Sequence, residues 1–314
     1  MNLAKDIIKG NRTALGQGIT LIESTLPKHK KQAQELINNC LTHSGESIRI
    51  GITGIPGVGK STFIDVFGNL LTKKGHKVAV LAIDPTSKKT QGSILGDKTR
   101  MSKLSNNENA FVRPSPNKNT LGGIAAKTRE SIILCEAAGF DIILIETVGV
   151  GQSETKVESI VDFFLLLMLA GAGDELQGIK RGIMELADAL IITKSDGKNL
   201  QDAKNAALRY KNAIHLFPIT ENGWIPQVKI CSALENNGID QIYNLIIDFD
   251  TQMKNNGWKK ENRYNQQKLW LHQIIKEELG NQKYEKLLNE NVIEKFEITL
   301  SESKSVYHIF DRLK

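Results

Sequence analysis

The 314 residues, 40% of them hydrophobic, suffice for one large buried core with small appendages. The net charge of +6 is modest, and basic residues alternate with acidic ones, which argues against a nucleic-acid partner. Residues 1–15 lack a secretory hydrophobic core, and the longest uncharged apolar stretch, Phe163 to Gly173, is too short to span a bilayer. We therefore expect a cytoplasmic protein with no nucleic-acid partner and no membrane partner.

Helical spacing of apolar residues marks the segment from Ala14 to Thr42, with an interruption at Pro27. We expect two or three helices there. Residues 1–45 are accordingly assigned to an N-terminal helical extension.

Short runs rich in valine, isoleucine and leucine then alternate with helical patterns, which is typical of a parallel sheet covered by helices. The run from Phe163 to Leu169 lacks polar alternation, which favours a central strand buried on both faces. The sequence predicts an α/β domain over residues 46–250 with a mostly parallel sheet. Its expected strands are Ile48–Thr53, Lys77–Ile83, Ala110–Arg113, Asp141–Glu146, Phe163–Leu169, Ala189–Thr193 and Gln227–Cys231.

The segment after the first expected strand, Gly54 to Ser61, reads Gly-Ile-Pro-Gly-Val-Gly-Lys-Ser, a complete phosphate-binding loop. Backbone N–H groups and a helix N-terminus would hold the β-phosphate, Lys60 would bridge the β- and γ-phosphates, and Ser61 would bind magnesium. We therefore expect a P-loop NTPase. The expected phosphate-binding residues are Gly54, Gly57, Val58, Gly59, Lys60, Ser61 and Thr62, with Gly149 from a later loop.

Acidic residues stand where expected strands end, at the edge of a parallel sheet where ligands gather. Asp84 and Glu146 both end strands and should point toward the phosphate loop, whereas Asp141 begins its strand and belongs on the opposite edge. Gly149 follows Glu146 closely and can offer its N–H to a γ-phosphate that is present only before hydrolysis. Asp97 is a second candidate for the magnesium shell, although an ordinary turn aspartate explains it equally well.

The segment Thr193 to Asp196 follows a strand at the edge where a purine would lie. The Asp196 carboxylate can accept from guanine N1–H and the exocyclic amine, and adenine provides neither donor in that arrangement. Asparagine more commonly fills the position of Thr193, whose hydroxyl can make some of the same contacts to the phosphate loop. The sequence thus favours GTP over ATP. The expected guanine-binding residues are Thr193, Lys194, Asp196, Ser232, Ala233 and Leu234.

After about Met253 the composition shifts to lysine, glutamate, asparagine and glutamine. One apolar stripe with helical spacing runs from Trp270 to Leu279 and stops at Gly280. The stripe needs a partner surface, which could be the nucleotide-binding core of the same chain or a second subunit, and spacing favours neither. Residues 251–314 are assigned to a C-terminal helical arm.

Five segments together resemble the MeaB/ArgK family of GTPases, chaperones of adenosylcobalamin-dependent methylmalonyl-CoA mutase and its relatives. The resemblance covers roughly residues 14 to 250 and, more loosely, the C-terminal arm. It implies a P-loop GTPase fold and a homodimer formed through that arm. The segments are Gly54 to Thr62, Gly92 to Met101, Arg113 to Pro116, Glu146 to Glu154 and Gly171 to Lys180.

The resemblance also implies roles for particular residues. The magnesium shell would comprise Ser61, Asp84, Asp97 and Glu146. Three segments would move, namely Gly92 to Met101, Val148 to Glu154 and Gly173 to Lys180. The last would communicate with the mutase through Asp174, Glu175, Gln177 and Lys180.

Hydrolysis of GTP to GDP needs little covalent chemistry beyond magnesium, a lysine, backbone donors and a polar residue that positions water. We assign Lys60, Gln152 and Glu154 to the catalytic group, with Gln152 as the candidate for orienting the attacking water. The protein would use GTP as a timer that gates delivery of adenosylcobalamin to the mutase or removal of damaged cofactor from it.

Two alternative functions belong to other classes. A metallochaperone GTPase of the nickel-insertion type would need thiol or imidazole ligands, yet Cys40, Cys135 and Cys231 are far apart in sequence and the six histidines form no cluster. A kinase associated with amino-acid transport would need a base for the substrate hydroxyl and a phosphoacceptor groove, for which the sequence offers no distinct residues.

Overall fold

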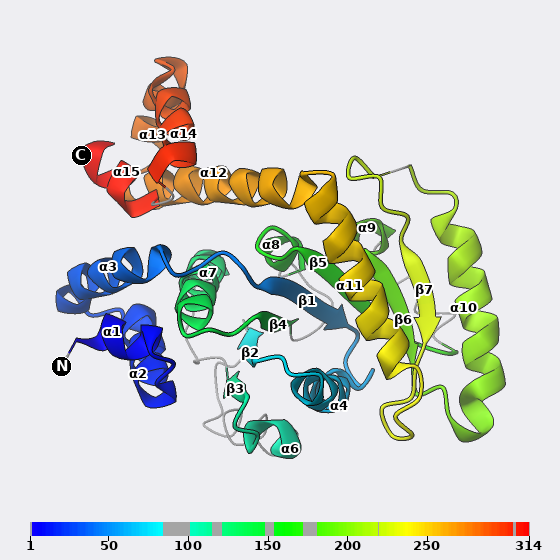
Figure 1. Cartoon of the computed structure of the whole chain (residues 1–314). Coiled ribbons are helices and arrows are strands. Elements are labelled where there is room, and N and C mark those ends of the chain that lie inside the picture. The colour runs from blue at the N-terminus through cyan, green and yellow to red at the C-terminus, as the bar shows by residue number, and fades with distance from the viewer. Residues whose placement is uncertain are drawn as a thin grey trace. The chain divides into compact units, whose positions relative to one another are not determined.

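The computed structural model describes residues 2–83, 101–114, 121–147, 154–171, 181–218, 220–303 and 306–313 (Figure 1). The chain divides into two compact units. The larger unit comprises residues 46–128 and 139–255 and contains the sheet. The smaller unit comprises residues 1–45, 129–138 and 256–314 and is helical.

Seven strands form one sheet in the order β3-β2-β4-β1-β5-β6-β7, and every neighbouring pair is parallel. Each strand lies within one residue of its predicted bounds at either end. The α/β fold with a parallel sheet is therefore confirmed. The strands are β1 (Ile48–Gly54), β2 (Val78–Ile83), β3 (Ala110–Arg113), β4 (Ile142–Thr147), β5 (Phe163–Leu169), β6 (Ala189–Thr193) and β7 (Gln227–Ile230).

Strand β5 lies deep in the sheet, between β1 and β6. Residues Phe163 to Met168 are each at most 1% exposed, which is why both faces of this strand are apolar. Phe163 packs edge-on against Phe249 of helix α11 (Ile239–Asn255), with ring centroids 4.9 Å apart. The prediction of a strand buried on both faces is confirmed.

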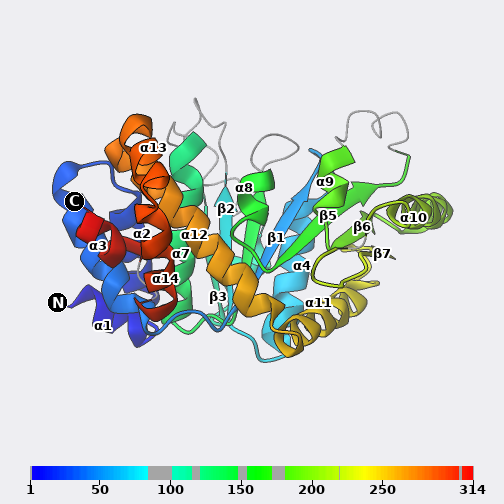
Figure 2. The same ribbon diagram turned by 90° about the horizontal axis from the view of Figure 1, so that it is seen from above.

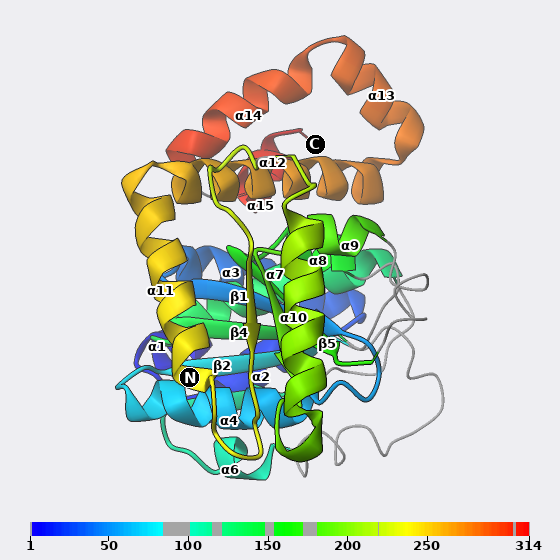
Figure 3. The same cartoon turned by 90° about the vertical axis from the view of Figure 1, so that its right-hand side faces the viewer.

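Helices cover both faces of the sheet: α4 and α8 lie on opposite sides of the strands in Figures 1 and 3. Helix α6 packs closely against α4 at Gly68, where an added Cβ would lie 2.5 Å from the Leu104 side chain. The described helices of this unit are α4 (Lys60–Lys73), α6 (Ser102–Ser105), α8 (Glu154–Glu158), α9 (Arg181–Glu185), the 3-10 helix η1 (Gly197–Asn199), α10 (Leu200–Ile214) and α11 (Ile239–Asn255), with the first part of α7 (Leu121–Ala137).

Aspartates just before three strands fix the register of the sheet at its amino edge, because each carboxylate accepts a backbone N–H from the adjacent strand or the residue before it. Asp141 is one of them, and its position confirms that it lies opposite the phosphate loop. The three bonds run from Lys77 N to Asp141 Oδ1 (2.7 Å), from Arg49 N to Asp162 Oδ2 (2.9 Å) and from Phe164 N to Asp188 Oδ2 (2.8 Å).

The smaller unit begins with three helices, α1 (Leu3–Ile8), α2 (Arg12–Glu23) and α3 (Pro27–Leu41). The Asn11 side chain caps α2 by accepting from the backbone N–H of Ala14 at 3.0 Å. Pro27 occupies the start of α3, where a missing N–H costs no helical bond. The expectation of two or three helices interrupted at Pro27 is confirmed.

The C-terminal helices are α12 (Trp258–Leu279), α13 (Asn281–Asn289), α14 (Val292–Ser303) and α15 (Val306–Leu313). Helix α12 ends at Gly280 as predicted, and its Trp270, Leu271, Ile274 and Ile275 are at most 6% exposed. Trp270 packs edge-on against Tyr307 of α15, which also contacts α3 (Figure 2). Helices of its own unit therefore cover the apolar stripe, a solution that spacing alone could not reveal.

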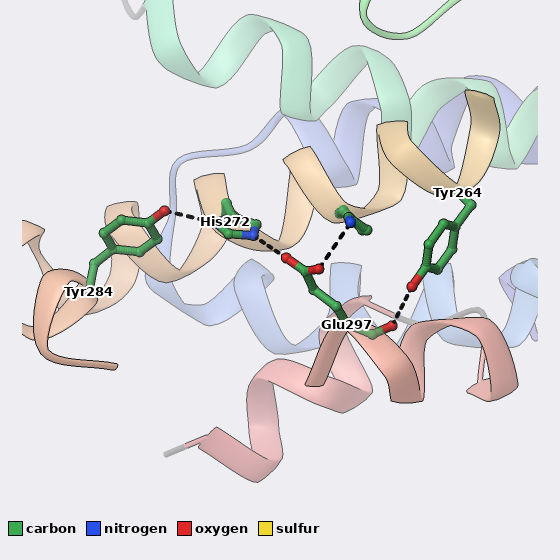
Figure 4. Close-up of polar contacts among 5 residues, drawn as sticks. Tyr264, His272, Tyr284 and Glu297 are labelled. Atoms are coloured by element: carbon green, nitrogen blue, oxygen red, sulfur yellow. Dashed lines mark hydrogen bonds and ion pairs between the residues drawn. The ribbon is translucent and has the colours of Figure 1, made fainter. Parts of the chain in front are cut away.

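A polar cluster around Glu297 joins α12, α13 and α14 (Figure 4). The carboxylate of Glu297 lies 2.6 Å from His272 Nε2 and 3.1 Å from Lys268 Nζ. Tyr264 donates to the Glu297 backbone carbonyl at 3.0 Å, and the Tyr284 hydroxyl lies 2.8 Å from His272 Nδ1. Burial acts to raise the pKa of Glu297, but the bonds from His272 and Lys268 outweigh it and lower that pKa. The polar groups of the cluster therefore satisfy one another.

Candidate nucleotide site

The phosphate loop connects β1 to α4 at the carboxyl edge of the sheet. Gly57 and Gly59 adopt φ angles of 79° and 97°, which glycine reaches readily and other residues rarely do. A Cβ on Gly54 would lie 2.5 Å from the Leu167 carbonyl oxygen of β5. The three glycines that identified the loop in the sequence are therefore required by its backbone path.

Lys60 begins α4, and its buried amine is satisfied by the loop itself. Its Nζ donates to the carbonyl oxygens of Gly54 at 2.8 Å and Ile55 at 3.2 Å. A phosphate oxygen would offer this cation a charged acceptor, and charge-assisted hydrogen bonds are stronger than those to neutral carbonyls. The amine is thus held over the loop by bonds that an anion can replace.

Ser61 and Glu146 meet although 85 positions separate them, because β1 and β4 are neighbours in the sheet. Ser61 Oγ donates to Glu146 Oε1 at 3.1 Å. A hydroxyl and a carboxylate are oxygen ligands of the kind that magnesium prefers, so this pair fits such an ion.

The loop after β6 is bonded directly to the phosphate loop. Thr193 is 5% exposed, and its Oγ1 lies 2.7 Å from the Val58 carbonyl oxygen and 3.2 Å from that of Met168. Lys194 Nζ donates to the Gly57 carbonyl oxygen at 2.8 Å. Threonine in place of the commoner asparagine therefore still reaches the phosphate loop.

The loops after β6 and β7 also meet. Ser232 Oγ donates to Asp196 Oδ2 at 2.5 Å. Ser232 Oγ also accepts from the backbone N–H of Glu235 at 3.1 Å. Ser232 is buried, whereas the Leu234 side chain is 82% exposed. Asp196 is thus oriented by Ser232, and Leu234 has only its backbone to offer a ligand in this loop.

The structure therefore brings together the phosphate loop, Glu146 and the loops carrying Asp196 and Ser232. The remaining predicted residues fall outside the part of the chain that the structure describes. They are Asp84, Asp97, Gly149, Gln152, Asp174, Glu175, Gln177 and Lys180, together with the side chain of Glu154.

Two threonines beside the site were not singled out from the sequence. Thr147 Oγ1 donates to Thr53 Oγ1 at 2.8 Å, and both residues are 0% exposed. They end β4 and nearly end β1, each next to a predicted ligand-binding residue. The signal in the sequence was a hydroxyl at or near the end of each of these two strands.

The thiols of the chain are poorly suited to binding metal. Burial raises the pKa of Cys40 to about 11 and that of Cys231 to about 12, and burial with nearby Glu136 raises the pKa of Cys135 still further. A raised pKa disfavours the thiolate, which is the form of cysteine that ligates metal. Within the described ranges, no three His, Cys, Asp or Glu residues form a metal-binding group. No helix in those same ranges is both long and apolar enough to cross a membrane.

Residues 15–287 match the family model of the methylmalonyl Co-A mutase-associated GTPase MeaB. The chain is 47% identical to GTPase ArgK of Escherichia coli (strain K12) over 87% of this chain and 82% of that one. It is 45% identical to the mitochondrial methylmalonic aciduria type A homolog of Mus musculus, over 86% and 68% respectively. The crystal structure of an LAO/AO transport system kinase is similar, with a TM-score of 0.77, 35% identity and coverage of 99% of this chain and 96% of that one. The chain therefore belongs to the MeaB family of methylmalonyl-CoA mutase-associated GTPases.

Proposed function

We propose that this protein is a GTP-hydrolysing chaperone for methylmalonyl-CoA mutase or a related acyl-CoA mutase. It gates the loading of adenosylcobalamin and protects or reactivates the mutase. Membership of the MeaB family supports the client, and the contacts of the nucleotide site support the reaction. The observation that carries the proposal is the joining of the Thr193 to Asp196 loop to the phosphate loop by two side-chain bonds.

The phosphate loop and Lys60 hold the β- and γ-phosphates in this proposal, and the Gly149 N–H meets the γ-phosphate. Ser61 and Glu146 hold magnesium, with Asp84 and Asp97 completing the shell as the family resemblance implies. Magnesium, when bound, neutralises charge on the β- and γ-oxygens. Gln152 orients the attacking water, and Glu154 belongs to the same catalytic group.

Guanine is recognised by Asp196, whose carboxylate is oriented by the Ser232 hydroxyl. The carboxylate accepts from N1–H and the exocyclic amine, while the backbone of Ser232 to Leu234 faces the guanine carbonyl oxygen. Lys194, fixed to the phosphate loop by its amine, lays its stem along the base. The two halves of GTP are thereby read by loops that are bonded to each other.

The mutase is sensed by the segment that holds Asp174, Glu175, Gln177 and Lys180, and partner binding completes the catalytic geometry. Two copies of the chain pair through the C-terminal arm. Since the Trp270 stripe is already buried, pairing uses other faces of these helices.

The two alternative functions have weaker support. A nickel metallochaperone would draw on thiolates, and the three cysteines are buried with raised pKa values. A kinase role is named for the similar LAO/AO transport system kinase, but the Asp196–Ser232 pair suits a guanine nucleotide. Assays of phosphate transfer and of hydrolysis with GTP and ATP separate the two readings.

Cofactor transfer tests the gating directly. Adenosylcobalamin is delivered to apo-mutase in the presence of this protein with GTP, GDP or a slowly hydrolysed GTP analogue, and its arrival is followed by absorbance. We expect loading to depend on which nucleotide is bound, and the Lys60→Ala variant to lose that dependence. Identical loading with all three nucleotides would count against the proposal.

A further inference from the structure

The buried hydroxyl pair of Thr53 and Thr147 lies directly under the nucleotide site. The last paired residues of β1 and β4 are Ile52 and Glu146, and the two threonines follow them. Thr53 precedes Gly54, where the phosphate loop begins, and Thr147 follows Glu146. The 2.8 Å bond between the Thr147 and Thr53 hydroxyls therefore links the start of the phosphate loop to the carboxyl end of β4.

Packing alone does not require a hydroxyl at either of these fully buried positions. Valine has nearly the same shape as threonine and would fill the space without any polar group. A buried hydroxyl is costly when it lacks a partner, but a satisfied pair constrains both distance and direction between the atoms it joins. The pair thus provides a directional link that apolar packing would not.

The end of β4 is held from both faces. Successive residues of a strand point to opposite sides, so Glu146 and Thr147 make their contacts on different faces of the sheet. Glu146 accepts from Ser61 on one side, and Thr147 donates to Thr53 on the other. If Ser61 turns its hydroxyl toward a cation, the Ser61–Glu146 bond is lost, whereas the bond between Thr147 and Thr53 does not depend on that rotation.

We propose that Thr53 and Thr147 are positioning residues for GTP hydrolysis. They hold the carboxyl end of β4 in register with the phosphate loop, so that Glu146 lies where it would hold magnesium during hydrolysis. This inference rests on the hydrolysis step of the proposed function and needs no mutase.

Valine and serine variants separate a positioning role from a structural one. Thr147→Val should lower kcat by about tenfold or more, because small misplacements near reacting atoms are costly. Its affinity for GDP, which has no γ-phosphate, should stay within about twofold of the wild-type value. Thr147→Ser keeps the hydroxyl and should recover most of kcat.

The double variant Thr53→Val/Thr147→Val removes both hydroxyls and leaves no unpaired polar group, so its unfolding midpoint should return toward that of the wild type. Its kcat should stay low, because the link is still absent. Thr72→Val is the matched control: Thr72 is a buried threonine near the far end of α4 whose hydroxyl donates to the Asn69 carbonyl oxygen. It should lower the midpoint and keep kcat.

A Thr147→Val enzyme with wild-type kcat, or a double variant whose kcat recovers together with its stability, would overturn the positioning role. All of these assays use the full-length protein without mutase. A mutase that failed to alter the wild-type rate would count against the chaperone proposal and would leave these comparisons unaffected.

Discussion

Polar side chains are satisfied in two different ways in the two units of this chain. At the nucleotide site, Lys60, Thr193 and Lys194 bond mainly to carbonyl oxygens of the glycine-rich loop. In the smaller unit, Glu297 and His272 bond to other side chains on neighbouring helices. Bonds to neutral carbonyls can be exchanged for stronger bonds to an anion, whereas side chains that already bond to one another have less to gain from a ligand. The first arrangement suits binding and the second suits stability.

Removing the amine of Lys60 should cause the largest loss of GTP hydrolysis. Lys60→Ala is expected to reduce GTP hydrolysis by about a thousandfold, since a cation aimed at developing charge is lost. The unfolding midpoint should change little, because the bonds from the amine to Gly54 and Ile55 go to neutral carbonyl groups of the loop. Lys73→Ala, at the exposed end of the same helix, is the control. Steady-state hydrolysis and thermal melts decide, and a variant that retains half of its activity would refute the assignment.

Changing the base-recognition carboxylate should have the next largest effect. Asp196→Asn is expected to weaken GTP binding by about a hundredfold, because it replaces a charged acceptor of two hydrogen bonds by an amide. Binding of xanthosine nucleotides should improve, as their base presents a carbonyl where guanine has an amine. Calorimetric titration of both nucleotides tests this, with the exposed Asp202→Asn as control. Unchanged GTP affinity would rule out Asp196 as the base contact.

A smaller effect is expected where the two loops are joined. Thr193→Val should weaken GTP binding by about tenfold and destabilise the fold by about 1–3 kcal/mol. The Thr193 hydroxyl is the hydrogen-bond donor to the buried carbonyl groups of Val58 and Met168, and valine has no such donor. Thr193→Ser retains the hydroxyl and should behave like the wild type. Equal GTP affinities for the valine and serine variants would show that this bond does not shape the site.

The cluster in the smaller unit should respond in the opposite manner. Glu297→Gln is expected to lower the free energy of unfolding by about 1–2 kcal/mol at neutral pH and to leave GTP hydrolysis unchanged. Glu294→Gln, on the exposed side of the same helix, is the matched control. Denaturant unfolding and hydrolysis rates are the measurements, and loss of activity without loss of stability would contradict a purely structural role.

The pH dependence of this effect has a defined sign. The pKa of Glu297 is lowered in the folded protein from an ordinary value of 4.5, so its contribution is complete above that pH. It is lost as the pH falls through the lower, folded-state pKa. The stability difference between wild type and Glu297→Gln should therefore shrink on acidification, and a difference that grows would show the opposite shift.

The sequence predicted which described segments of the candidate nucleotide site come together, because short segments carry its chemistry. Glycines at Gly54, Gly57 and Gly59 leave a fixed spacing, and the rule that parallel strands gather ligands at one edge placed Glu146 beside Ser61. The contact between Thr53 and Thr147 was not predicted, because a threonine at a strand end is common. The order of the strands in the sheet is needed to show that the two residues meet.

The helical unit was less predictable. An apolar stripe specifies that a face is buried, but many surfaces can cover it. The cover of Trp270 comes partly from Tyr307, and no spacing rule links residues on α12 and α15. Contacts such as that between Lys268 and Glu297 depend on how separate helices pack, which periodicity does not determine.

The chaperone proposal is tested most directly by the rate of GTP hydrolysis by the purified protein, alone and with an adenosylcobalamin-dependent methylmalonyl-CoA mutase from the same source. ATP serves as the control nucleotide. We predict that hydrolysis is slow, specific to GTP and clearly stimulated by the mutase. A GTP rate that the mutase leaves unchanged would contradict methylmalonyl-CoA mutase as the client and direct the search to other acyl-CoA mutases.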